Sequence, residues 1–215
     1  MIRFVVAFDE RANDLGDYFY DCKLDIVGFL TEQDNIIYQA IHEMPSASCN
    51  EAYVDLRVQP YNPAPFVFIA YSHGLSKALR CGGNSYVSMG VNSNRFTNAL
   101  FYTNACLVGK ELGQDLVDNG CGTFVGYEEE IQAFKVDEYK RISIDCDNAG
   151  LKFFFTQDST IENAMRAAKQ HYTNMIDRLV DVKDMLYAGF LTASREALVI
   201  KGNTELRKED LYYTP

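Results

Sequence analysis

The chain has 215 residues, of which 47 % are hydrophobic, and a formal net charge of −10. This length and composition are typical of a globular protein with a large core, so one domain over residues 1–215 is expected and a disordered chain is excluded. The acidic balance offers no basic face for phosphate contacts, so no nucleic-acid partner is expected. The first apolar run ends at Asp9 and Glu10, so it is too short to form a signal-peptide core or a membrane span. We therefore expect a cytoplasmic protein without membrane association.

The cysteines and histidines show no metal-binding pattern. No two cysteines form a C-x-x-C pair, and the three histidines do not fall at zinc-finger spacing, so neither a metal nor a cofactor is expected. In a reducing cytosol the six thiols are expected to be free, and most of them to be small core residues.

In chain order, the first half alternates apolar runs with helical patterns. Strands are predicted over 2–8, 52–58, 66–72 and 98–105, helices over 14–30 and 32–43, and a short strand or hairpin arm over 86–91. The strand at 66–72 is apolar throughout, as a central parallel strand requires.

In the second half, an apolar stripe after residue 106 predicts a helix that ends at Gly120, where a C-terminal cap belongs. Strands are predicted over 122–127, 141–146, 151–156 and 196–202, the middle two as a hairpin. Ser159 and Glu162 form a capping box for a long helix, whose stripe of core residues runs from Ile161 to Leu186. The alternation of strands and helices along the whole chain predicts an α/β fold, a three-layer α/β/α sandwich with a mostly parallel central sheet.

Two reactive residue types follow two of the apolar strands. His73 comes after the strand at 66–72, and Cys106 comes after the strand at 98–105. If these strands are parallel neighbours about 4.8 Å apart, the two side chains share the sheet edge where α/β proteins bind ligands. An imidazole there can deprotonate the thiol, and a helix opening at Cys106 would lower the pKa of the thiol.

The same residues also allow plainer interpretations. A histidine after a strand is often a polar turn residue, and a cysteine there is often part of the core. Other chemistries lack their motifs, since the chain contains neither G-x-S-x-G nor the P-loop pattern. The segment GCGTFVG has the wrong spacing for a dinucleotide site and precedes a strand instead of following one.

The segments FVFIAYSHG and NALFYTNAC resemble the two motifs of caspase-like cysteine peptidases, in which one apolar strand ends in His-Gly and a second ends in Ala-Cys. The segment ACLVGKELGQDLVDNGCGTFVGY is similar to the corresponding part of the CHAT and gingipain-like members, and ALVIKGNTELR to their closing strand and turn. The resemblance covers residues 66–127 well and the remainder loosely.

The resemblance implies a caspase-like fold and a catalytic dyad, with Cys106 as nucleophile and His73 as general base and acid. It further implies an oxyanion hole from the backbone N–H groups of Gly74 and Cys106. Asn104, two residues before the cysteine, would line the pocket for the substrate side chain that precedes the cleaved bond. No residue of the sequence is assigned to orient His73.

We therefore predict a cysteine endopeptidase that cleaves a protein or peptide substrate through an acyl-enzyme, with loops 75–97 and 128–140 shaping its groove. Activation by a partner protein or by self-cleavage is expected. Two alternatives remain open. The short interval of 33 positions between His73 and Cys106 leaves room for a caspase-like interaction or regulatory module with an idle cysteine. A small-molecule amidohydrolase would use the same dyad.

Overall fold

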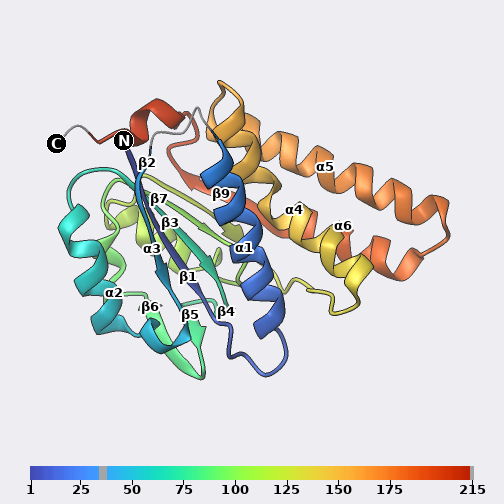
Figure 1. Cartoon of the computed structure of the whole chain (residues 1–215), viewed down its shortest axis with the longest axis horizontal. Coiled ribbons are helices and arrows are strands. Elements are labelled where there is room, and N and C mark those ends of the chain that lie inside the picture. Colours follow the sequence, from blue (N-terminus) through green and yellow to red (C-terminus); the bar gives the residue numbers. More distant parts are fainter. Residues whose placement is uncertain (34–37, 214–215) are drawn as a thin grey trace.

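A six-stranded sheet forms the centre of the computed structural model, which describes residues 1–33 and 38–213 (Figure 1). The strand order is β2-β1-β3-β7-β8-β9, and every neighbouring pair is parallel except β8 and β9, which are antiparallel. The strands are β1 (Ile2–Phe8), β2 (Tyr38–Met44), β3 (Phe66–Tyr71), β7 (Ala99–Thr103), β8 (Thr123–Tyr127) and β9 (Leu198–Gly202).

A small antiparallel sheet follows β3 directly. It consists of β4 (His73–Leu75), β5 (Ala78–Cys81) and β6 (Asn84–Ser88). The hairpin arm predicted near residue 86 is therefore confirmed, and His73 is the first residue of this second sheet.

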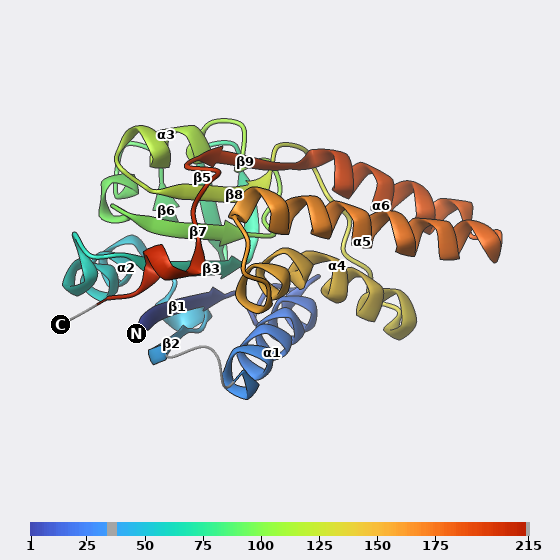
Figure 2. The ribbon, with the colours of Figure 1, turned by 90° about the horizontal axis from the view of Figure 1, so that it is seen from above.

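Helices cover both faces of the central sheet, because each strand sends alternate side chains to opposite faces. Phe4 and Val6 of β1 pack in one core with α1, α4 and the start of α5, whereas Val5 and Ala7 pack in the other core with α2, α3 and the small sheet. The predicted three-layer α/β/α sandwich is confirmed (Figure 2). The helices are α1 (Gly16–Glu32), α2 (Glu51–Val58), α3 (Leu112–Asp118), α4 (Asp137–Thr156), α5 (Ile161–Asp181) and α6 (Met185–Ala197).

Two predictions for residues 32–58 are wrong. The predicted helix over 32–43 gives way to strand β2, apart from residues 34–37, which lie outside the described residues. The predicted strand over 52–58 is helix α2, in which Val54 and Val58 are buried one helical turn apart and the side chain of Asn50 caps the first turn.

The predicted hairpin over 141–156 is also wrong, because these residues form the continuous helix α4. The run Phe153-Phe154-Phe155 favours a strand by propensity, but Leu151, Phe154 and Phe155 are fully buried against the sheet at helical spacing. The capping residue of α5 is Thr160 and not Ser159, since the Thr160 hydroxyl accepts the N–H of Asn163.

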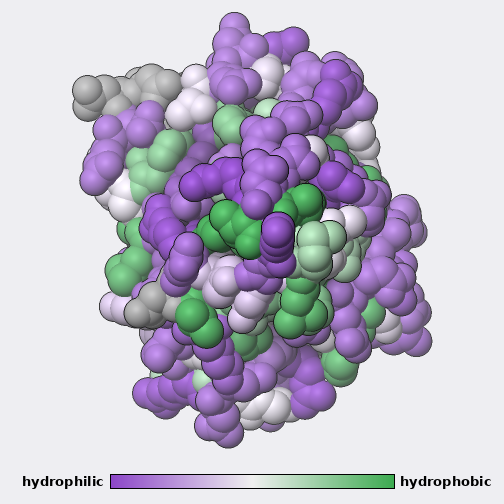
Figure 3. Space-filling model, turned by 90° about the vertical axis from the view of Figure 1, so that its right-hand side faces the viewer, coloured by the Kyte–Doolittle hydropathy of each residue, from purple (hydrophilic) through white to green (hydrophobic). Residues whose placement is uncertain are grey.

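The long helix predicted to reach Leu186 is two antiparallel helices, α5 and α6, which turn at Lys183 with a φ of +64°. Both helices extend beyond the end of the sheet (Figure 2). Apolar side chains gather at the far end of this helical hairpin, within a hydrophilic surround (Figure 3). The most exposed are Val182 at 72 % and Met185 and Leu186 at 64 % each. Val182 and Leu186 are the last two positions of the predicted core stripe, so the prediction that they are buried is wrong.

Candidate active site

His73 and Cys106 lie at the carboxyl edge of the neighbouring parallel strands β3 and β7. Both side chains line one small cavity of about 20 Å³, together with Leu15, Tyr18, Phe19, Ser72, Asn104, Ile131 and Ala133. This volume holds about one water molecule. Among the described residues, the hydrogen-bond partners of the two side chains are Asp14 and Ile131 rather than each other.

Asp14 is the hydrogen-bond partner of the His73 ring, for which the sequence alone assigned no orienting residue. The Asp14 carboxylate lies 3.0 Å from Nε2 of His73, and the imidazole stands edge-to-face on the Phe19 ring at 5.3 Å. The pKa of Asp14 is lowered. Burial by itself would raise this pKa, but the hydrogen bonds from His73 and from the backbone outweigh that effect. Asp14 lies between β1 and α1, and β1 pairs with β3, so a polar residue beyond the end of the first strand is the signal that could have identified it.

Cys106 does not open a helix, contrary to the prediction. Residues 106–111 form turns, and α3 begins only at Leu112. The proposed lowering of the pKa by a helix N-terminus is therefore wrong: burial raises the pKa of the Cys106 thiol, with the carboxylates of Glu130 and Asp147 adding to the shift. The next residue, Leu107, has a φ of +65°, a strained conformation for a branched side chain.

The segment after β8 covers the thiol. The backbone N–H of Ile131 donates to Sγ of Cys106 at 3.4 Å, and the thiol donates to the carbonyl of Ile131 at 3.6 Å. Ion pairs of Glu128 with Lys201 and of Glu129 with Lys110 hold the same segment against the protein. In the predicted groove-shaping loop 128–140, Ile131 contacts the Cys106 thiol and Ala133 lines the same cavity, while the residues from Asp137 on belong to α4.

Gly74 lies directly against the segment that carries Cys106. A Cβ atom at Gly74 would collide with the carbonyl oxygen of Cys106 and would lie 2.9 Å from the Cβ of Ala105. The two motifs are thus in contact, and this contact requires a glycine. The oxyanion role of the Gly74 and Cys106 N–H groups stays a prediction.

Asn104 lies in the wall of the cavity and is 4 % exposed. Its Nδ2 donates to the Asp147 carboxylate at 3.1 Å, while its Oδ1 is buried without a hydrogen-bond partner among the described residues. The role of Asn104 in substrate binding stays a prediction.

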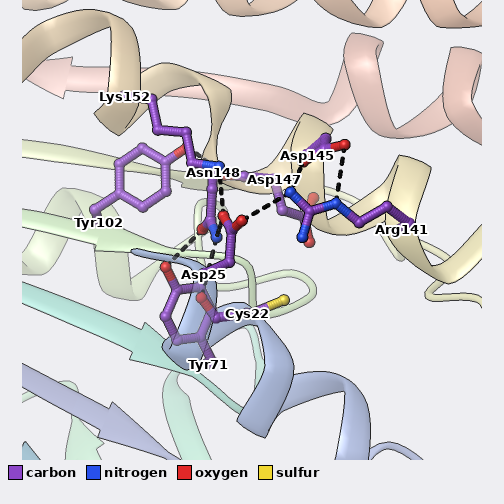
Figure 4. Close-up of polar contacts among 9 residues, drawn as sticks. All are labelled: Cys22, Asp25, Tyr71, Tyr102, Arg141, Asp145, Asp147, Asn148 and Lys152. Carbon is purple, nitrogen blue, oxygen red and sulfur yellow. Dashed lines mark hydrogen bonds and ion pairs between the residues drawn. The ribbon is translucent and has the colours of Figure 1, made fainter. Parts of the chain in front are cut away.

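Asn104 is hydrogen-bonded to a buried polar network around Asp147 and Asn148. This network lies between α1, the sheet and α4 (Figure 4). The Asp147 carboxylate accepts hydrogen bonds from Tyr18 at 2.7 Å, Tyr127 at 3.0 Å and Tyr172 at 2.9 Å, besides that from Asn104. Burial raises the pKa of Asp147, and these four donors oppose the shift.

The neighbouring Asn148 continues the network toward the surface. It accepts from the Tyr71 hydroxyl at 2.6 Å and donates to Asp25 at 2.8 Å, and Asp25 also pairs with Arg141 and Lys152 (Figure 4). Sequence reasoning missed these residues because it placed 141–156 in strands. The network fixes the wall of the cavity from behind.

Neither a metal site nor a disulfide occurs in the part of the chain that the structure describes. Its histidines, cysteines and carboxylates form no cluster of three that could hold a metal ion, and all six cysteines are free. Among the described helices, none combines the length and the apolar character needed to cross a bilayer.

Comparison with known proteins adds a likeness of fold. No family model matches the chain, and no curated protein matches it. Among solved structures, it is similar to a secreted C11 cysteine protease from Bacteroides thetaiotaomicron, named iotapain. The two are 10 % identical, with a TM-score of 0.47, and the match covers 82 % of this chain and 70 % of the other. The CHAT and gingipain-like branch and the cytoplasmic location stay predictions.

Proposed function

We propose that this protein is a cysteine endopeptidase whose dyad is Cys106 and His73, with Asp14 as the residue that positions the imidazole. The observation that carries the proposal is the shared cavity at the carboxyl ends of β3 and β7, which is lined by both a thiol and an imidazole that is hydrogen-bonded to a carboxylate. A thiol nucleophile, a base and a group that orients the base are the parts that acyl transfer needs.

The hydrogen bond to Asp14 assigns the roles of the two ring nitrogens. With Nε2–H donated to the carboxylate, Nδ1 is left as the base. Nδ1 would take the proton of Cys106, the thiolate would attack the substrate carbonyl, and the imidazolium would return the proton to the leaving amine. Water would then hydrolyse the thioester by the same route, and Asp14 would stabilise the imidazolium in both halves.

Substrate entry requires the segment 128–136 to move, because Ile131 occupies the hydrogen-bonding positions around Sγ and the cavity holds about one water molecule. The structure thus corresponds to a closed state of the proposed enzyme. A protein partner or self-cleavage would release the segment, and a protein or peptide would be the substrate.

The covered thiol also supports a second candidate, an interaction module with an idle cysteine. Its raised pKa and its hydrogen bonds to Ile131 are what a structural cysteine would show. The two candidates differ in turnover and in labelling, so one experiment separates them.

The experiment combines peptide-library digestion, read by mass spectrometry, with labelling by a peptide that carries a thiol-reactive electrophile. The peptidase proposal expects cleavage and labelling that are lost in Cys106→Ala and His73→Ala and kept in Cys146→Ala, a buried cysteine away from the cavity. A library of small amides run in parallel tests the amidohydrolase. Labelling that survives Cys106→Ala, or cleavage that does not need His73, would exclude the dyad. A protein that binds a defined partner, but neither cleaves nor labels either with that partner bound or after limited proteolysis within residues 128–136, would establish the interaction module.

A further inference from the structure

A second pocket lies at the opposite end of the sheet, beside the start of β1. Its volume is about 270 Å³, and it is lined by Arg3, Ala40, His42, Pro60, Tyr61 and Tyr213. The dyad follows the carboxyl ends of β3 and β7, whereas Arg3 is the second residue of β1, a strand parallel to both. The pocket is therefore separate from the candidate active site.

Arg3 is an unusual residue for this position. It is 5 % exposed, and no carboxylate of the described residues lies within ion-pair distance of its guanidinium. Nη2 donates to the carbonyls of Pro65 at 2.9 Å and Tyr61 at 3.4 Å, but Nε is buried without a partner in the described part of the chain. Because a buried charge is costly unless it is paired, the guanidinium retains capacity for an anion.

The surroundings of Arg3 also favour an anion. The rings of Tyr61 and Tyr213 lie 4.7 Å and 4.1 Å from the guanidinium carbon, so their faces stabilise the cation and leave its edge for hydrogen bonding. Burial lowers the pKa of His42 in the pocket wall, and the charge of Arg57 adds to this shift, so a second arginine lies near the pocket in a chain whose net charge is −10.

We propose that this pocket binds a small oxyanion, a phosphate or carboxylate group, through the edge of the Arg3 guanidinium between the two tyrosine rings. The planar guanidinium matches the paired oxygens of both groups. The volume admits a compact ligand and not a chain of residues. The proposal does not depend on the peptidase activity.

The test is a thermal-unfolding titration of the full chain with inorganic phosphate and with benzoate, each compared with sodium chloride at equal ionic strength. At a ligand concentration tenfold above Kd, binding raises Tm by roughly 3–6 °C for a chain of this size. The rise should vanish in Arg3→Met and persist in Arg166→Met, which makes the same change at an exposed arginine of α5. The ligand that gives the larger rise identifies the chemical class.

A second variant keeps the proposal testable if Arg3→Met does not fold. Ala40→Leu fills the pocket from β2 and leaves the guanidinium in place, so it should also abolish the rise. A wild-type protein that responds to phosphate and benzoate no more than to chloride would overturn the proposal. An equal rise in Arg3→Met or in Ala40→Leu would do the same.

Discussion

The Asp147 network makes a sharp prediction, because two substitutions of similar size should differ widely in stability. Asp147→Leu removes the acceptor of four buried donors, namely the amide of Asn104 and the hydroxyls of Tyr18, Tyr127 and Tyr172. The last two hydroxyls are 2.9 Å apart and can bond to each other, so three donors lose an acceptor. At about 1–3 kcal/mol for each, the loss is roughly 3–9 kcal/mol, comparable to the whole stability of a typical protein.

Asp147→Asn should be far milder. The amide oxygen can keep the bonds from Tyr18 and Asn104, while its NH₂ group faces the two tyrosine hydroxyls, which can rotate to accept. One hydroxyl proton then lacks an acceptor, a cost of about 1–3 kcal/mol that removal of the buried charge partly offsets. We expect a net loss of about 0–2 kcal/mol.

The pH dependence supplies a further check. Because the pKa of Asp147 is raised in the folded protein, the folded state binds more protons than the unfolded state between the ordinary and the raised value. The contribution of this group to stability therefore falls as pH rises through that window, and Asp147→Asn removes this dependence. Urea unfolding of the three proteins across pH measures both effects. An Asp147→Leu protein within about 1 kcal/mol of the wild type would refute the account of the network.

Three other predictions concern the candidate site. Asp14→Asn should lower kcat/KM by at most about fivefold, since the contact of Asp14 with the imidazolium formed during the reaction is half exposed and such pairs contribute about 0.2–1 kcal/mol. Asp158→Asn, a change at another exposed carboxylate, should leave kcat/KM unchanged. Gly74→Ala should destabilise the protein by about 1–3 kcal/mol in thermal unfolding, because its methyl group collides with the backbone of Cys106; a neutral effect would show that the two motifs are not in contact. Ile131→Pro removes the N–H that bonds to the thiol and should loosen the covering segment, so the rate of Cys106 alkylation should rise roughly tenfold at alkaline pH, where loss of a bond that lowers the thiol pKa matters least. An unchanged rate would mean that this segment does not protect the thiol.

The sequence predicted the sheet well because burial alone determines the apolar runs of β1, β3, β7 and β8, which are buried at every position. It failed where tertiary contacts decide between helix and strand. In α2, the two buried valines are four positions apart, but these β-branched residues and Tyr53 favour a strand by propensity. In α4, the buried face carries polar residues such as Asp147 and Asn148, so the apolar pattern by which a helix is recognised is interrupted. These residues are buried because they bond to tyrosines from distant elements, which the local sequence does not show.

In the candidate site, too, some features could be predicted from the local sequence and others depend on tertiary contacts. The order of His73 and Cys106 after two apolar strands was sufficient to place them together, since neighbouring parallel strands end at the same edge. Asp14 lies 59 positions before His73 and could be linked to it only through the pairing of β1 with β3. The helix expected at Cys106 failed because Leu107 takes a left-handed conformation that no local pattern of an L-residue predicts.

The error at Cys106 changes how the proposed thiol would be activated. With α3 starting only at Leu112, no helix N-terminus lies at the sulfur to stabilise a thiolate. Burial is the largest cause of the raised pKa, and the segment that includes Ile131 contributes that burial while it also blocks the cavity. On the peptidase proposal, displacement of residues 128–136 would admit the substrate and remove burial that raises the pKa of Cys106. It would also remove the hydrogen bond from the Ile131 N–H, which lowers that pKa, but burial is the larger of the two causes, so the net change is a lower pKa. Alkylation rates measured against pH in the wild type and in Ile131→Pro test this coupling. A faster reaction with an unchanged apparent pKa would show that access and ionisation are controlled separately.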